Sequence, residues 1–149
     1  MIFFSDHIEK YIPPKKGRKH ILYIIREMLD FHSASCKTDI GEAVAFFTRM
    51  MKRRTTAFLI SDFYDRHDFT KQIQIANNKH DEMSIQVYDR WAKQLPDVGL
   101  IKINDAETGH EQYLDTSSRK VRQAHARYWM EHEAHLRETF SRSSVDWVS

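Results

Sequence analysis

The chain has 149 residues, of which 41% are hydrophobic and 30% are charged. This length allows one domain with a hydrophobic core, and the composition excludes a disordered or membrane-embedded protein. A net charge of +2 is too small to indicate a nucleic-acid partner by itself. No apolar run approaches the ~20 residues that span a bilayer, and no secretory signal pattern follows Met1. With its single cysteine, Cys36, the chain is typical of a cytoplasmic protein, and we expect no membrane segment.

The first segments predict a hairpin followed by a helix. Residues 1–6 form an apolar strand, and residues 7–12 alternate apolar and polar side chains, as an exposed edge strand does. Pro13 and Pro14 end that strand, because proline cannot donate to the ladder. Residues 17–31 have the apolar spacing of a helix. The apolar stripe of this helix consists of Ile21, Leu22, Ile24, Ile25, Met28 and Leu29.

A second helix is predicted to begin near Thr38 and Asp39. Either residue can cap it, and Asp39 and Glu42 have the spacing of a capping box, although Asp replaces the usual Ser or Thr. The inward face of this helix consists of Ile40, Val44, Phe47 and Met51.

The strand of residues 55–63 is the element around which the others can be arranged. Ala57 to Ile60 are consecutive apolar residues, bounded by a basic run and by Ser61 and Asp62. Such a run predicts a strand covered on both faces, as at the centre of a parallel sheet. Asp62 would then lie at the carboxyl end of a central strand, where open α/β sheets bind their ligands.

The second half of the chain continues the alternation of helices and strands. Residues 69–79 and 117–140 are predicted to be helical, and Asp68 can cap the first of these helices. Further strands are predicted over residues 83–89, 100–103, 111–114 and 145–148. Residues 104–110 form the turn of a hairpin. The order predicts an α/β fold with a doubly wound, mostly parallel sheet and an antiparallel hairpin at one edge.

Three groups of residues, in this order, resemble a bacterial family. The first is the run from Phe3 to His20, which includes Ser5-Asp6-His7 and Pro13-Pro14. The second is Thr38-Asp39-Ile40 followed by Phe58-Leu59-Ile60-Ser61-Asp62-Phe63. The third is Leu95-Pro96-Asp97-Val98-Gly99 with Asp105-Ala106-Glu107-Thr108-Gly109. Together they resemble the C-terminal part of the "domain of unknown function fifty-eight" family, which is built on a von Willebrand factor A-like domain. The resemblance implies a single Rossmann-like domain over residues 1–149 that is incomplete at its N-terminus.

The resemblance also implies a metal-ion-dependent adhesion site (MIDAS). In that fold the ligands are an Asp-x-Ser-x-Ser motif, a Thr and an Asp, on three loops at the carboxyl ends of the strands. Thr38 matches the second ligand and Asp62 the third, with Asp39 and Ser61 as neighbours. Oxygen ligands of this kind suit Mg²⁺, which the intact domain is expected to bind. Asp-x-Ser-x-Ser is absent from this sequence, so we expect metal binding here to be weak or absent.

The absent motif has a consequence for assembly. In the family it lies on a strand between those of residues 2–4 and 57–60, and the resemblance places it upstream of Met1. Without that strand, two sheet edges and apolar surface would need cover. We expect the two halves to slide together, or a homo-oligomer or another chain to cover the exposed edges.

For function, the resemblance implies a non-enzymatic protein–protein interaction domain. Family members are often encoded beside MoxR-type AAA+ ATPases, which implies a role in complex assembly or maturation with such a partner. The alternative is a small-molecule or phosphate-binding α/β enzyme that uses Asp62 at the carboxyl edge of the sheet, although no Gly-rich phosphate loop is present. The basic cluster of residues 15–19 is compatible with nucleic-acid contact, but a docking patch or a solvated helix start is the simpler interpretation.

Other reactive residues give weaker signals. Ser61 has no histidine tied to it by spacing and no nucleophile-elbow motif, so we expect no hydrolase activity and assign no catalytic residue. His132 and His135 are three residues apart, whereas the zinc-protease helix motif requires four. We therefore expect these histidines and Glu133 on the solvated face of a long helix.

Overall fold

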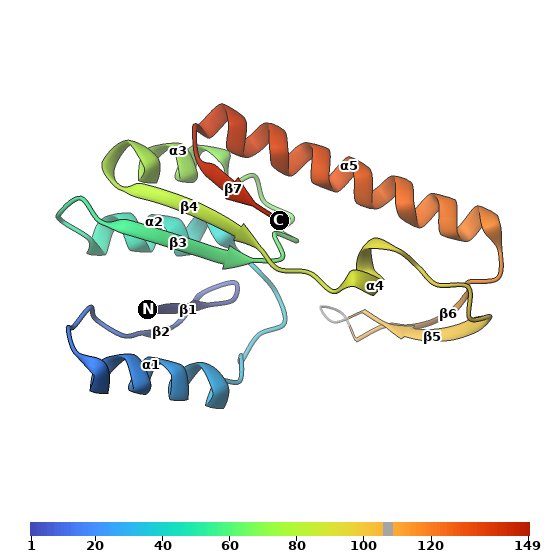
Figure 1. Ribbon diagram of the computed structural model, residues 1–149, viewed down its shortest axis with the longest axis horizontal. Helices are drawn as coiled ribbons and strands as arrows, with labels where there is room; N and C mark the ends of the chain where they lie inside the picture. Colours follow the sequence, from blue (N-terminus) through green and yellow to red (C-terminus); the bar gives the residue numbers. More distant parts are fainter. Residues whose placement is uncertain (106–108) are drawn as a thin grey trace.

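The structure is a computed structural model that describes residues 1–105 and 109–149. The described strands form a three-stranded parallel sheet and two antiparallel hairpins, with helices between them (Figure 1). The predicted α/β class, parallel pairing and antiparallel hairpins are therefore confirmed. The hairpins are sheets of their own, however, and neither is hydrogen-bonded to the parallel sheet as an edge.

The parallel sheet has the order β3–β4–β7, with β4 in the middle. Its strands are β3 (Thr56–Ser61), β4 (Asp81–Gln86) and β7 (Asp146–Val148). The prediction of a central strand covered on both faces is wrong for β3, because β4 is its only partner among the described strands. Phe58 and Ile60 on its outer face are 59% and 53% exposed.

The main core lies between the sheet and three helices: α2 (Ile40–Met50), α3 (Thr70–Lys79) and the C-terminal half of α5 (Arg119–Ser143). Of the two predicted candidates, Thr38 and Asp39, it is Asp39 that caps α2, since its Oδ1 accepts a hydrogen bond from Glu42 N at 2.7 Å. The rings of Phe63 and Phe140 meet edge to face at 5.1 Å in the centre of this core. The buried core residues are Ile40, Val44, Phe63, Phe69, Ile73, Ala76, Leu136, Phe140 and Val145.

The N-terminal unit consists of β1 (Ile2–Phe4), β2 (Ile8–Tyr11) and α1 (Arg18–Asp30). An ion pair between Lys10 and Glu27 joins α1 to the hairpin, and Figure 1 shows α1 on the side of the hairpin away from the parallel sheet. None of the residues of α1 is buried, and Leu29 is 79% exposed. The apolar stripe predicted for this helix is therefore present but faces solvent.

The remaining elements form an arm beside the N-terminus of α5. They are the short helix α4 (Arg90–Lys93) and the hairpin of β5 (Leu100–Asn104) and β6 (Glu111–Asp115) (Figure 1). Thr116 Oγ1 donates to Gly99 O at 2.6 Å and so closes the base of the hairpin. Part of the predicted turn, residues 106–108, lies outside the described residues. Among the described helices, none is both long and apolar enough to cross a membrane.

Candidate functional site

The loop after β3 carries the predicted ligand Asp62, and short-range hydrogen bonds shape it. Ser61 Oγ accepts from Phe63 N at 3.0 Å, and Asp62 Oδ1 accepts from Tyr64 N at 3.2 Å. Phe63 has a left-handed backbone with φ 60, which is costly for an aromatic residue. Its side chain is 1% exposed, so burial in the core holds this conformation in place.

Asp65 connects this loop to the beginning of α2. The Asp65 side chain has no solvent exposure, and its Oδ2 accepts a hydrogen bond from Ile40 N at 2.7 Å. Its Oδ1 accepts from His67 N at 2.8 Å and lies 3.0 Å from His67 Nδ1. A carboxylate at a helix N-terminus satisfies free backbone N–H groups and interacts favourably with the helix dipole. Asp65 therefore fixes the loop relative to α2.

Asp39, Asp65 and His67 form a compact group of side chains. One ligand atom from each lies within 4.8 Å of the others, a geometry compatible with a cation. Asp39 and Asp65 already accept hydrogen bonds from backbone N–H groups of α2, and His67 contacts Asp65. Helix capping therefore explains the arrangement without an ion.

The structure brings together only some of the predicted site residues. Asp39, expected as a neighbour of the metal, is in the group with Asp65 and His67, whereas Asp62 is not. Asp62 is exposed, and its side chain contacts Tyr64 N and the hydroxyl of Ser61. Thr38 is half-buried in the loop before α2. Metal ligation by Thr38 and Asp62 stays a prediction.

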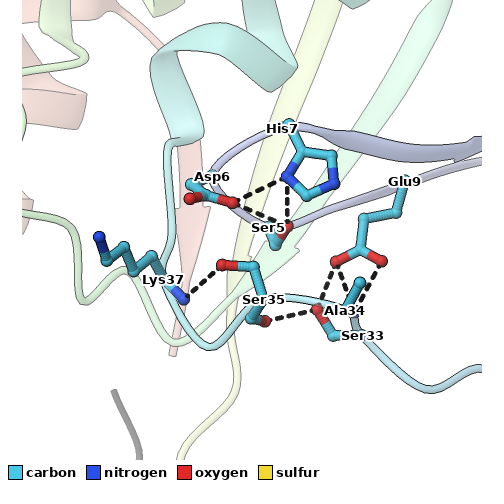
Figure 2. A network of polar contacts seen from close by, with 8 residues as sticks. All are labelled: Ser5, Asp6, His7, Glu9, Ser33, Ala34, Ser35 and Lys37. Atoms are coloured by element: carbon cyan, nitrogen blue, oxygen red, sulfur yellow. Dashed lines mark hydrogen bonds and ion pairs between the residues drawn. The ribbon is translucent and has the colours of Figure 1, made fainter. Parts of the chain in front are cut away.

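A polar network positions the loop that carries Thr38 and Asp39 (Figure 2). Glu9 of β2 accepts two hydrogen bonds from Ala34 N, at 2.9 and 3.1 Å, and another from the hydroxyl of Ser33. These bonds lower the pKa of Glu9 to about 2. Asp39 N also donates to Ser5 O at 2.9 Å. The N-terminal hairpin therefore holds the start of α2.

A groove of about 470 Å³ lies between the N-terminal hairpin, α2 and β3. Its walls are mostly apolar and include Ile2 and Phe4 of β1, Val44 and Phe47 of α2, and every residue from Thr55 to Ile60. Asp62, Thr38 and Asp39 do not line it. The groove is therefore separate from the predicted metal site.

Glu82 of β4 also lines this groove, and sequence reasoning missed it. The side chain is 6% exposed, and neither carboxylate oxygen has a hydrogen-bond partner among the described residues. Burial raises the pKa of Glu82 to about 7. A buried carboxylate without a partner is unfavourable, so this residue is a candidate for contact with a bound group.

The alternation in residues 83–87 was the available signal, and it correctly predicts a strand. The alternation of Met83, Ile85 and Val87 with Ser84 and Gln86 does not show which face is covered. The parallel register places Glu82 beside Ala57 and Ser84 beside Leu59, on the face covered by helices. The polar set of β4 is therefore buried: Glu82, Ser84 and Gln86.

The aromatic contacts on α5 correct the expectation for its histidines. His132 stacks on Tyr64 with ring centroids 4.4 Å apart and an interplanar angle of 3°, and burial lowers the pKa of His132. Glu133 pairs with Lys93 at 3.3 Å. Both residues are half-buried, so the predicted solvated face is wrong for them, whereas His135 is exposed.

Comparison with known proteins supports the family assignment. The family model "Protein of unknown function DUF58" matches residues 1–135. Over 100 residues, the chain is 29% identical to an uncharacterized protein of Mycobacterium tuberculosis and to one of Mycobacterium bovis, and 28% identical to one of Mycobacterium avium. The match covers 66% of this chain, 32% of each of the first two relatives and 59% of the third.

This chain thus spans about a third of the length of the M. tuberculosis and M. bovis relatives that it matches. No solved structure matches it significantly. The matched region includes both hairpins, the groove and the loop after β3, whereas the end of α5 and β7 lie beyond it. The chain belongs to the DUF58 family of proteins of unknown function.

Proposed function

We propose that the chain is a non-enzymatic protein–protein interaction domain of the von Willebrand factor A-like type, which acts in the cytoplasm. Its function is to assist complex assembly or maturation together with a MoxR-type AAA+ ATPase. The ATPase partner follows from the family resemblance. The structural observation that supports a binding role is that many large apolar side chains are exposed to solvent.

This surface has two parts on different elements. On the outer face of the parallel sheet, Phe58 and Ile60 lie beside Met83 and Ile85 in register, and the 56%-exposed Val148 continues the row. On α1, the exposed apolar residues are Ile21, Leu22, Tyr23, Ile25, Met28 and Leu29. Monomeric soluble proteins rarely expose large contiguous apolar patches, and such patches mark interaction sites.

Binding to the ATPase can be tested by biolayer interferometry, with the MoxR-type ATPase from the same organism immobilised. We expect saturable binding by the wild type and at least a tenfold loss of affinity in Ile25→Asp, because a charge would be desolvated in the interface. The matched control is Leu100→Asp, which alters a 67%-exposed apolar residue on the separate arm. Absence of binding by the wild type with and without nucleotide would reject the ATPase as partner.

Self-association is a second part of this proposal. A second copy that covers the α1 stripe or the outer face of the sheet would bury the surface that a lone chain exposes. Sedimentation velocity should then show a dimer or larger species that Phe58→Asp dissociates. A wild type that remains monomeric at all concentrations would exclude self-association and leave the ATPase as the partner to test.

A further inference from the structure

We propose that His80 is an acid-sensitive switch, in which protonation of the imidazole ring releases the C-terminal end of α2 from the junction between α3 and β4. The switch is a property of the fold and does not depend on which partner the chain binds. All the elements that surround His80 lie inside the region that the family model matches.

His80 lies where α3 ends and β4 begins. Its backbone N donates to Ala76 O at 2.7 Å, which closes the last turn of α3. The residue has no exposed surface, and neither ring nitrogen has a hydrogen-bond partner among the described residues. A neutral imidazole can remain in such a site, whereas an imidazolium needs water or an acceptor for both of its N–H groups. Protonation therefore drives the ring toward solvent.

The ring of His80 packs against α2, which is the element that would have to move. The ring centroids of His80 and Phe47 are 4.7 Å apart. Beside this contact, Lys79 Nζ donates at 2.5 Å to Thr48 O, one of the last carbonyls of α2, which an α-helix leaves without an internal partner. Both contacts join the end of α2 to the end of α3, while Asp65 holds the beginning of α2 separately. Movement of the His80 ring therefore affects the C-terminal end of α2 first.

The charges around the ring leave burial as the dominant effect. Burial and the nearby Lys79 ammonium lower the pKa of His80, whereas the backbone of Arg53 and the carboxylate of Asp81 act in the opposite direction. Asp81 Oδ1 lies 2.6 Å from Arg54 Nη2, and this ion pair compensates much of the Asp81 charge. The neutral ring is therefore the form that the fold stabilises.

The carboxylates on the neighbouring elements do not supply a counter-ion. On α2, Glu42 pairs with Arg49 at 2.9 Å. On β4, Glu82 is buried two residues beyond His80, and burial raises the pKa of Glu82 to about 7. Glu82 is therefore mostly neutral in the acidic range in which His80 takes up its proton. Neither carboxylate is available to pair with the protonated ring.

The pH range of the switch follows from the direction of the pKa shift. A released imidazole takes up a proton near pH 6.5, whereas the buried ring does so only at lower pH. The contribution of His80 to stability is therefore complete above pH 6.5 and is lost as the pH falls below this value. Opening of the junction becomes up to about tenfold more frequent for each pH unit, until the pH reaches the pKa of the buried ring.

Hydrogen exchange measured by mass spectrometry tests this proposal on the whole chain. Peptides that cover residues 44–51 report on the end of α2, and each exchange rate is corrected for the intrinsic rate at the same pH. Between pH 7.5 and pH 5.5 we expect the protection of this segment to fall several-fold, up to about tenfold, in the wild type. In His80→Phe, which keeps an aromatic ring against Phe47 but cannot take up a proton, this fall should be absent. In the control His135→Gln, which removes an exposed histidine of α5, it should persist.

A second variant and a direct titration complete the test. If circular dichroism shows that His80→Phe does not fold, His80→Gln takes its place, because a smaller amide side chain also carries no charge in this range. NMR titration of the ring protons of His80 in the wild type gives its pKa, which we expect below 6.5.

Three outcomes would overturn the proposal. The first is a His80 pKa at or above 6.5, which would mean that a carboxylate such as Glu82 pairs with the protonated ring. The second is equal protection of residues 44–51 at both pH values in the wild type. The third is the same loss of protection in the folded His80 variant as in the wild type, which would assign the acid effect to another group.

Discussion

The parallel sheet with α2, α3 and α5 differs from the N-terminal unit in how its apolar residues are used. Both regions contain a helix with a clear apolar stripe, on α2 and on α1. Four residues of α2 are buried, whereas α1 has none. The stripe of α2 meets α3 and the sheet, while that of α1 meets solvent. Amphipathic spacing therefore identifies the face that can be buried, and the presence of a partner element decides whether it is.

The largest expected effect contrasts these two regions directly. Phe140→Ala should lower the free energy of unfolding by about 3–5 kcal/mol, because it leaves a cavity beside Phe63. Leu29→Ala on α1 should change it by no more than about 0.5 kcal/mol, since the side chain is already exposed. Urea denaturation followed by circular dichroism measures both. Similar losses in the two variants would show that α1 is packed in solution.

Glu82 gives the next largest effect, and its sign depends on pH. The folded-state pKa is about 7 and the reference value is 4.5, so the folded protein retains a proton that the unfolded chain releases. The contribution of Glu82 to the free energy of unfolding therefore decreases as pH rises from about 4.5 to about 7. The total decrease is about 3 kcal/mol. Glu82→Gln should accordingly be more stable than the wild type at pH 8 by up to this amount, with little difference at pH 4.5.

Glu82→Gln must be compared with the wild type at each pH, because other groups titrate in the same pH range and also change the stability. Burial lowers the pKa values of His80 and His132, so their contribution increases stability as pH rises toward 6.5. These histidines are present in both proteins, and the difference isolates Glu82. Urea denaturation at several pH values gives the measurement, and a pH-independent difference would show that the pKa of Glu82 does not change on folding.

A smaller effect is expected at the junction of the loop after β3 with α2. Asp65→Ala should destabilise the fold by about 1–3 kcal/mol, because Ile40 N and His67 N lose their acceptor. Asp39→Ala should cost about 1 kcal/mol through loss of the helix cap. Thermal unfolding of the two variants compares them. If Asp65→Ala is as stable as the wild type, Asp65 does not anchor the loop.

The smallest effect is expected from Mg²⁺. Titration calorimetry should show no binding tighter than about 1 mM, because the sequence lacks Asp-x-Ser-x-Ser and the oxygens of Asp39 and Asp65 already cap α2. Saturable, tighter binding that is lost in Asp62→Ala would contradict this expectation and support the predicted ligand set. Loss in Asp65→Ala but not in Asp62→Ala would instead identify the group with His67 as the site.

Local patterns were enough to predict most of the elements. The Asp39 cap, the strand that ends at Ser61 and the strand of residues 146–148 all follow from short-range residue chemistry. The long-range pairing could not be predicted, because a run such as Ala57–Ile60 has the same composition in a central and in an edge strand. The structure has β3 at an edge.

The site was predicted less completely than the fold, for a similar reason. Asp39 and Asp62 were identified by position in the chain, but Asp65 became visible only when the loop was placed against α2. Glu82 was hidden by an alternation that gives no sign of which face is covered. His132 was assigned to solvent because the stacking of Tyr64 on α5 joins residues far apart in sequence.

The register of β7 has a consequence for the order of folding. Met83 of β4 pairs with Asp146 of β7, and α5 precedes β7 with a single turn between them. The parallel sheet can therefore be completed only after a connection of about 60 residues, including the arm and α5, has been brought into position. Contacts of such long range slow folding, so we expect β4 and β7 to pair late, at the step in which α5 docks.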